Sequence, residues 1–249
     1  MRVLGLGPGP SEWLTEEARG ALERAEHVLG YSTYLSRLPP LPGKVLHASD
    51  NGDELERARH GLELALGGAR VAIVSGGDPG VFGMAAAVFE AIERGHERYR
   101  RLDVAVLPGV TAMLAAAARL GAPLGNDFCA INLSNNLKPW AVIERRLVLA
   151  AQAGFVIALY NPASRARPSQ VHEAFTLLRQ HRSEQTLVVF ARAIGRADEQ
   201  VTVTTLGRAD PAQADMRTLL LIGTESTRAI EREASVPWVY TPRFVVEAS

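Results

Sequence analysis

The sequence predicts an α/β protein in which short strands alternate with helices. Six runs of Val, Ile and Leu without polar alternation are spread along the 249 residues. Such runs are typical of strands in a parallel sheet that is covered on both faces. Apolar residues at helical spacing fill most of the intervals, and glycine- and proline-rich turns follow four of the runs.

The six apolar runs are the expected strands. They are Val3–Leu6, Val71–Val74, Val104–Leu107, Phe155–Tyr160, Leu187–Phe190 and Leu219–Ile222. The segment Gln200–Thr205 alternates and contains β-branched residues, which favours an antiparallel strand or a hairpin. Cys129 stands beside Phe128 in another strand-like stretch, where we expect a buried, unreactive thiol.

Five segments carry apolar residues at helical spacing. They run from Leu14 to Ala25, from Leu55 to Leu66, from Ala85 to Ile92, from Thr111 to Leu120 and from Val171 to Leu178. Gly67, Gly95 and Gly121 follow three of them as stop signals. Ser169 is the expected N-cap of the last one.

A polar, turn-rich stretch, Leu120–Asp127, lies near the middle of the chain. It predicts a boundary between two α/β domains, residues 1–122 and 123–249. The chain is long enough for two domains of ordinary size, each with its own core.

Composition excludes several classes of function. The 27 Lys and Arg residues balance 27 Asp and Glu residues, whereas nucleic-acid binders carry a basic excess. No apolar run reaches the ~18 residues of a membrane span, and the N-terminus lacks the features of a signal peptide. We therefore expect a soluble, cytoplasmic protein that binds neither nucleic acid nor membrane.

The sequence also argues against a metal site. A single cysteine, Cys129, excludes an intramolecular disulfide and a cysteine-clustered zinc site. The six histidines lack metal-binding spacing, and most are expected to be solvated on helix faces or ends. They are His27, His47, His60, His96, His172 and His181.

Four loops of similar character follow expected strands. They are Gly5–Gly9, Ser75–Gly80, Pro108–Ala112 and Tyr160–Pro162. Ligands of open α/β sheets bind at the carboxyl ends of the strands. The four loops together therefore predict a ligand site at that edge.

The loops do not fit the common nucleotide motifs. Pro10 stands where a dinucleotide fingerprint needs glycine, and neither a P-loop nor a G-x-S-x-G elbow is present. Gly76 and Gly77 would let the backbone approach a ligand closely. Asp78 could accept hydrogen bonds from ribose hydroxyl groups; alternatively, it caps a helix that starts near Phe82.

Arginines gather after two strands of the second half. Arg165 and Arg167 follow Tyr160–Pro162, and Arg192 and Arg196 follow Leu187–Phe190. Their position favours a ligand rich in carboxylates or phosphates. The alternative is a solvated, charged surface.

In this order, the loops resemble those of the tetrapyrrole (corrin/porphyrin) methylase family. The family pattern has a strand followed by G-x-G-P-G, here Gly5–Gly9. It continues with a G-D-P loop, here Gly77–Pro79, and a P-G-x-[ST]-[AS] segment, here Pro108–Ala112. The resemblance covers essentially the whole chain, and it includes longer segments such as Pro139–Leu147 and Ile157–Pro162.

The resemblance implies two α/β domains with a cofactor cleft between them, and a homodimer. It implies that the cofactor is S-adenosylmethionine, bound in a folded conformation. The ligand positions that it carries to this chain are Pro8, Gly76, Gly77, Asp78, Val81, Thr111, Ala112, Asn161 and Ile194.

The implied activity is methylation of precorrin-3B at carbon 17 with contraction of the ring, giving precorrin-4 in cobalamin biosynthesis. Arg165, Arg167, Arg192 and Arg196 are the candidates for holding the substrate carboxylates. No residue stands out as a general base. The alternatives are the same reaction on cobalt-factor III, and a non-catalytic tetrapyrrole- or nucleotide-binding protein.

Overall fold

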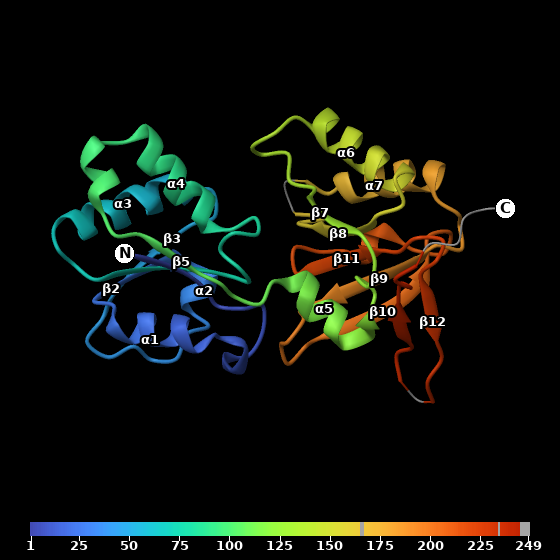
Figure 1. The fold of residues 1–249 in the computed structure, drawn as a ribbon, viewed down its shortest axis with the longest axis horizontal. Coiled ribbons are helices and arrows are strands. Elements are labelled where there is room, and N and C mark those ends of the chain that lie inside the picture. The colour runs from blue at the N-terminus through green and yellow to red at the C-terminus, as the bar shows by residue number, and fades with distance from the viewer. Residues whose placement is uncertain (165–166, 234, 245–249) are drawn as a thin grey trace. The chain divides into compact units, whose positions relative to one another are not determined.

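A computed structural model describes residues 1–164, 167–233 and 235–244. The chain forms two compact units, Met1–Thr111 and Ala112–Ser249, and both are α/β (Figure 1). The division falls before the helix Ala112–Leu120, whereas the sequence placed it after that helix, between residues 122 and 123. The helix groups with the second unit because Ala116 and Leu120 are buried where it packs on that unit's strands.

The first unit is built on a five-stranded sheet in which every neighbouring pair is parallel. The strands are β1 (Arg2–Gly5), β2 (His27–Tyr31), β3 (Val45–Ser49), β4 (Val71–Ser75) and β5 (Ala105–Leu107), in the order β3-β2-β4-β1-β5. Three of these strands were expected from apolar runs. The pattern missed β2 and β3; β3 lies at the edge and is largely exposed.

Helices cover both faces of this sheet. They are α1 (Glu16–Arg24), α2 (Ser32–Leu35), α3 (Glu54–Leu66) and α4 (Met84–Arg94), with the 3-10 turns η1 (Ser11–Trp13) and η2 (Glu97–Arg101). In Figure 1, α3 and α4 lie on one face and α1 and α2 on the other. Successive strand residues point to opposite faces: Val3 and Ile73 pack in the α3–α4 core, and Leu4 and Val74 in the α1–α2 core.

The second unit has a mixed five-stranded sheet. Its strands are β7 (Phe128–Asn132), β8 (Val156–Tyr160), β9 (Leu187–Arg192), β10 (Gln200–Thr205) and β11 (Thr218–Ile222), in the order β10-β9-β11-β8-β7. β10 pairs antiparallel with β9, as expected. The expectation of parallel pairing is wrong for Leu219–Ile222 and for Leu187–Phe190. β11 runs antiparallel to both β8 and β9, and β9 is flanked by β10 and β11, which are both antiparallel to it. Burial on both faces removes polar alternation whichever way a strand runs.

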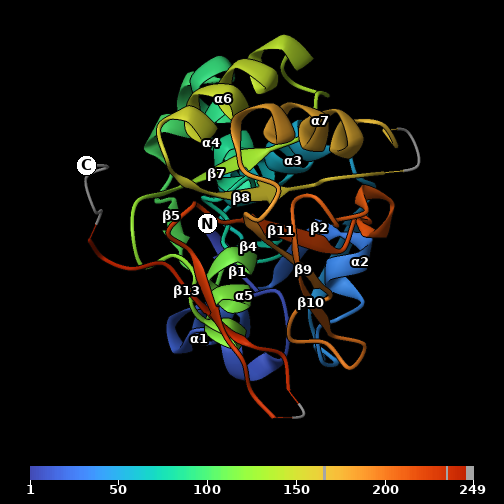
Figure 2. The ribbon, with the colours of Figure 1, turned by 90° about the vertical axis from the view of Figure 1, so that its right-hand side faces the viewer.

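The remaining elements of the second unit are α5 (Ala112–Leu120), α6 (Trp140–Gln152), α7 (Gln170–His181), η3 (Pro211–Gln213), β6 (Gly121–Ala122), β12 (Arg228–Ile230) and β13 (Trp238–Tyr240). In both views α6 and α7 lie on one side of the sheet and α5 on the other (Figure 1 and Figure 2). Phe175 and Leu147 fill the core between α6, α7 and the strands. Ser169 occupies the N-cap position of α7, but its side chain makes no capping hydrogen bond.

Two other expectations concern the cysteine and membrane spans. Cys129, in β7, is half-buried, and burial raises the pKa of its thiol, in keeping with an unreactive cysteine. In the described part of the chain, every helix is too short or too polar to cross a bilayer.

Candidate functional site

Three loops of the first unit meet at the carboxyl ends of β1, β4 and β5. The amide of Gly7 donates to the carbonyl of Gly77 at 3.1 Å, and the amide of Gly77 donates back to the carbonyl of Gly7 at 3.1 Å. The amide of Leu6 donates to the carbonyl of Ser75 at 2.9 Å. The loop after β1 and the loop after β4 are thus joined backbone to backbone.

Glycine is required at this junction mainly because the loops approach one another. A Cβ on Gly5 would lie 2.5 Å from the carbonyl oxygen of Gly77, and a Cβ on Gly109 would lie 2.4 Å from the same oxygen. A Cβ on Gly76 would lie 2.7 Å from the ring of Tyr34. At Gly77, by contrast, the nearest atoms would be 3.8 Å away, so this residue alone of the four leaves room beside its backbone.

Asp78 ties two of the loops together. Its Oδ1 accepts from the amide of Gly80 at 2.7 Å, and its Oδ2 accepts from the amide of Gly109, in the loop after β5, at 3.0 Å. The alternative role as a helix cap is wrong, because the first amide of α4, that of Met84, donates to Ser75 Oγ at 3.3 Å. Each carboxylate oxygen of Asp78 keeps a lone pair that could accept from a ligand hydroxyl.

The other expected residues of this unit belong to the same loops. Pro8 directly follows Gly7, and the amide of Val81 donates to the carbonyl of Asp78 at 3.3 Å. Thr111 is buried, and its Cα would lie 3.8 Å from a Cβ on Gly77. The structure therefore brings Pro8, Gly76, Gly77, Asp78, Val81 and Thr111 to one edge of the first sheet.

In the second unit, the loop after β8 is tied to the start of α5, where Ala112 lies. The amide of Met113 donates to the hydroxyl of Tyr160 at 3.1 Å. Asn161 adopts a left-handed backbone conformation with φ 51°. Its Nδ2 donates to Oδ1 of Asn132, at the end of β7, at 3.1 Å. A non-glycine residue with positive φ is uncommon and is often found at ligand-binding sites.

The loop after β9 has the same character. Ala193 is left-handed with φ 52°, and both Ala193 and Ile194 are buried. Because the Ile194 side chain is buried, a ligand at this loop would meet mainly the backbone. The amide of Gly195 donates to Glu199 Oε2 at 2.6 Å. Sequence reasoning missed Glu199 and the hydroxyl of Tyr160.

The four candidate arginines differ sharply from one another. Arg165 lies outside the described residues. Arg167 is only 9% exposed, its NH1 has no hydrogen-bond partner among the described residues, and burial lowers its pKa. A solvated surface is therefore the wrong interpretation for Arg167. Arg192 bonds Asp215 at 2.8 Å and Asp198 at 3.3 Å, and these carboxylates raise its pKa. Arg196 is half-buried.

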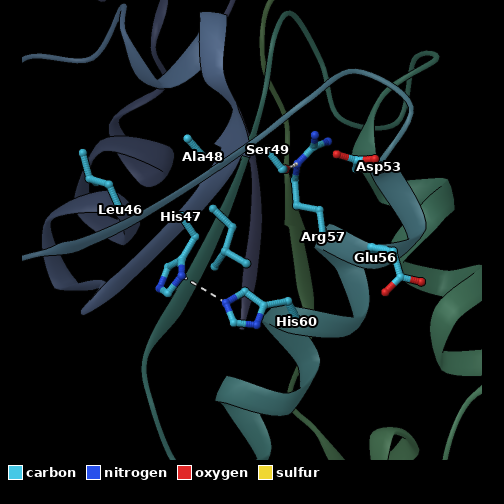
Figure 3. A pocket seen from close by; sticks show the side chains of 9 residues that line it. Leu46, His47, Ala48, Ser49, Asp53, Glu56, Arg57 and His60 are labelled. Carbon is cyan, nitrogen blue, oxygen red and sulfur yellow. Dashed lines mark hydrogen bonds between the residues drawn. The ribbon is translucent and has the colours of Figure 1, made fainter.

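A cavity of about 610 Å³ lies between β3 and α3 (Figure 3). It is lined by none of the nine expected cofactor residues. His47 and Ser49 come from β3, and Arg57 and His60 come from α3. The buried guanidinium of Arg57 donates to Ser49 Oγ and to the carbonyl of Asp50, each at 2.7 Å.

Three histidines form a hydrogen-bonded chain beside this cavity. Most of the six histidines do lie on helix faces or ends, as expected: His60 is in α3, His172 and His181 are in α7, and His96 caps η2. His27 Nδ1 lies 2.9 Å from His47 Nε2, and His47 Nδ1 lies 3.0 Å from His60 Nε2. His27 and His47 are strand residues. The central ring uses its two nitrogens toward different neighbours, so the three cannot share one metal ion. Within the described ranges, no group of three or more His, Cys, Asp and Glu residues could hold a metal.

Comparison with known proteins gives a consistent result. The family model described as "Tetrapyrrole (Corrin/Porphyrin) Methylases" matches residues 2–210. The chain is 54% identical over 247 residues to the precorrin-3B C(17)-methyltransferase of Sinorhizobium sp, covering 99% of this chain and 97% of the relative. It is 42% identical over 244 residues to a probable cobalt-factor III C(17)-methyltransferase of Salmonella typhimurium, covering 97% and 99%. The crystal structure of the methyltransferase CobJ superposes with a TM-score of 0.91 at 48% identity, covering 97% of this chain and 98% of that one.

Proposed function

The chain belongs to the tetrapyrrole (corrin/porphyrin) methylase family, and we propose that it methylates precorrin-3B at carbon 17 and contracts the ring, giving precorrin-4. It is a methyltransferase of cobalamin biosynthesis. The observation that carries this conclusion is the 54% identity over 247 residues to a precorrin-3B C(17)-methyltransferase, which spans nearly all of both chains. The CobJ structure, at a TM-score of 0.91, supports the same reaction class.

The methyl donor that we propose is S-adenosylmethionine, which supplies an activated methyl group when bound. The loops of the first unit suit such a ligand. The room beside Gly77 lets a ligand approach the backbone, and Asp78 keeps acceptor sites for the hydroxyl groups of a ribose. Pro8, Gly76, Val81 and Thr111 complete this set of proposed contacts.

The second unit contributes Ala112, Asn161 and the backbone around Ile194 to the proposed cofactor contacts. Two of these segments contain left-handed non-glycine residues, Asn161 and Ala193. The protein's task in methyl transfer is alignment, because holding the reacting carbons in contact can be worth ~7–11 kcal/mol. Rigid, unusual backbone geometry in the loops fits that task better than a catalytic dyad would.

Arg167 is the arginine best suited to hold the tetrapyrrole, whose side chains carry several carboxylates. Arg167 is buried, and among the described residues burial alone accounts for its lowered pKa. A buried ion without a counter-ion is costly, so a substrate carboxylate would supply the missing charge. Arg192 is less suited, since Asp215 and Asp198 already neutralise it. Arg165 and Arg196 remain candidates.

A second candidate substrate is cobalt-factor III. The 42% identity to a probable cobalt-factor III C(17)-methyltransferase supports it, but the higher identity to the precorrin-3B enzyme favours the cobalt-free substrate. We further propose that the protein is a cytoplasmic homodimer. Sedimentation equilibrium of the purified chain tests the dimer.

The decisive experiment is incubation with methyl-labelled S-adenosylmethionine and either precorrin-3B or cobalt-factor III, followed by mass spectrometry. We expect one labelled methyl group in a ring-contracted product from precorrin-3B. Turnover of cobalt-factor III alone would select the second candidate. Binding of S-adenosylhomocysteine without turnover of either tetrapyrrole would identify a non-catalytic binding protein.

A further inference from the structure

The loop between β9 and β10 is held in a conformation that its sequence does not favour by itself. Ala193 has φ 52°, and a left-handed alanine is strained because its Cβ crowds the backbone. Its amide donates to the carbonyl of Arg217 at 2.9 Å, and its carbonyl accepts from the amide of Arg196 at 3.0 Å. These bonds fix the two ends of the turn but leave Gly195 to another partner.

That partner is the carboxylate of Glu199. Its Oε2 accepts from the amide of Gly195 at 2.6 Å. Gly195 itself is left-handed, with φ 76°. A hydrogen bond to an ionised group is about twice as strong as a neutral one. Glu199 therefore holds the middle of the turn, immediately after Ile194, from within the same loop.

The other oxygen of Glu199 reaches a helix. Its Oε1 accepts from Arg119 Nε at 2.8 Å, and the two side chains are 24% and 44% exposed. Arg119 lies in the last turn of α5, whose first turn is bonded to the hydroxyl of Tyr160 through the amide of Met113. One helix is thus tied at its start to the loop after β8 and at its end to the loop after β9.

We propose that Glu199 is a positioning residue for S-adenosylmethionine. It fixes the backbone of residues 193–195 in the binding conformation and, through Arg119, sets that backbone relative to the start of α5. This inference rests on the proposed function, which places cofactor contacts at Ala112, Asn161 and Ile194. Glu199 acts through the Gly195 amide and does not itself touch the cofactor.

The test compares the affinity of four proteins for S-adenosylhomocysteine by titration calorimetry at 20 °C: wild type, Glu199→Ala, Glu199→Gln and Asp198→Asn. We expect Glu199→Ala to raise the Kd about tenfold, equivalent to about 1.4 kcal/mol. We expect Glu199→Gln, which can still accept from Gly195, to raise it about threefold. Asp198 pairs with Arg192 and Arg217 without bonding the backbone of residues 193–195, so its variant should bind like wild type.

Steady-state kinetics separate positioning from simple stabilisation. In Glu199→Ala the KM for S-adenosylmethionine should rise about tenfold, while kcat at saturating cofactor and the KM for the tetrapyrrole stay within about threefold. Arg119→Met should raise the Kd about twofold on its own, because a partly exposed ion pair contributes little. Added to Glu199→Ala, Arg119→Met should raise the Kd by less than it does in the wild type, because its contact with Glu199 is already lost.

Several results would overturn the inference. Wild-type affinity in both Glu199 variants, with only a lower melting temperature, would make Glu199 a purely structural residue. An equal loss in Asp198→Asn would point to general loosening of the loop. If wild type itself binds no S-adenosylhomocysteine, the proposed function fails first, and that outcome is distinguishable from wild-type binding that the variants leave intact.

Discussion

Gly109 is the residue at which we expect an added methyl group to disturb the proposed cofactor-binding loops most. In Gly109→Ala the new Cβ would lie 2.4 Å from the carbonyl oxygen of Gly77 and 2.8 Å from the Cα of Gly5. Both neighbours are backbone, so the loops after β1, β4 and β5 must separate. We expect a loss of stability of ~1–3 kcal/mol and at least a tenfold weaker binding of S-adenosylhomocysteine, measured by denaturant unfolding and calorimetry.

Gly20→Ala is the matched control for that variant. A Cβ there would meet only the far end of the flexible Arg24 side chain, at 3.1 Å, and alanine favours the interior of α1. Stability should stay the same or rise, with cofactor affinity unchanged. Normal affinity in Gly109→Ala would mean that the interlocked loops do not shape the cofactor site.

Arg167 should show opposite effects on stability and on substrate binding. Its NH1 is buried and has no hydrogen-bond partner in the described part of the chain. Arg167→Met therefore removes a desolvated charge and should leave the ligand-free protein equally or more stable. The same change should weaken binding of the tetrapyrrole about tenfold or more, because charge-assisted hydrogen bonds contribute ~1.5–3 kcal/mol. Thermal unfolding and substrate titration measure the two quantities.

Arg192→Met provides the comparison. Because Asp215 and Asp198 pair with Arg192, that variant should lose some stability and change substrate affinity by less than about twofold. If the loss of affinity appears in Arg192→Met and not in Arg167→Met, burial is the wrong criterion for choosing among the arginines.

For single residues, the sequence predicted where the site residues lie better than it predicted which groups they bond. The loop residues Gly77 and Asp78 were predicted as a site from their place after a strand, and the structure gathers them with the other loops. Their long-range bonds could not be predicted, since Asp78 bonds Gly109, 31 residues away. The histidine chain was missed for the same reason, because strand pairing, not sequence spacing, brings His27 beside His47.

Among the elements, β2, β3 and α3 are joined by the histidine chain, and we expect this contact to depend on pH. Burial, followed by His60 and His27, lowers the pKa of His47 below the ordinary 6.5. The unfolded chain therefore binds the proton more tightly, so stability should be fully present above pH 7 and fall as the pH drops through 6.5. Denaturant unfolding between pH 5 and 8 should show a shallower slope for His47→Gln than for wild type.

The groups around His47 include the cavity carboxylates of Asp53 and Glu56 and the Arg57 guanidinium. These groups are present in both proteins, so the difference in slope reports the removal of His47. His172→Gln, in α7 and outside the chain of histidines, should keep the wild-type slope. Identical slopes for wild type and His47→Gln would contradict a lowered pKa.

Elements with strong local patterns were the predictable ones. The apolar runs that form β1, β4, β8 and β9 are buried throughout or nearly so. A buried strand consists almost entirely of apolar residues, so its sequence is easy to recognise. β3 escaped notice because an exposed edge strand need not be apolar. α6 was missed although Ile143, Leu147 and Ala151 recur every four residues and are all buried. Strand direction, as at β11, depends on connections that composition does not record.

For the whole molecule, the position of the boundary between the two units can be tested with fragments of the chain. Among the residues that the structure describes, the two cores of the first unit contain none beyond Thr111. A fragment of residues 1–111 should therefore fold and unfold cooperatively. A fragment of residues 1–122 adds α5, whose apolar residues, including Ala116 and Leu120, would then lack their partners in the second unit. It should aggregate on size-exclusion chromatography.

Thermal melts by circular dichroism complete the comparison. Neither fragment should bind S-adenosylhomocysteine with wild-type affinity, because Asn161 and Ile194 are missing from both. Greater stability and solubility of the 1–122 fragment would place the domain boundary after α5, as the sequence suggested.

The reciprocal bonds between Gly7 and Gly77 have a consequence for hydrogen–deuterium exchange. Loop amides normally exchange quickly, but the amides of Gly7, Gly77 and Gly109 all donate to acceptors within the protein. They should exchange as slowly as amides in the adjoining strands. Because these loops are already held by internal hydrogen bonds, they should lose little conformational entropy when the cofactor binds. Adding S-adenosylhomocysteine should therefore barely slow the exchange of these three amides further.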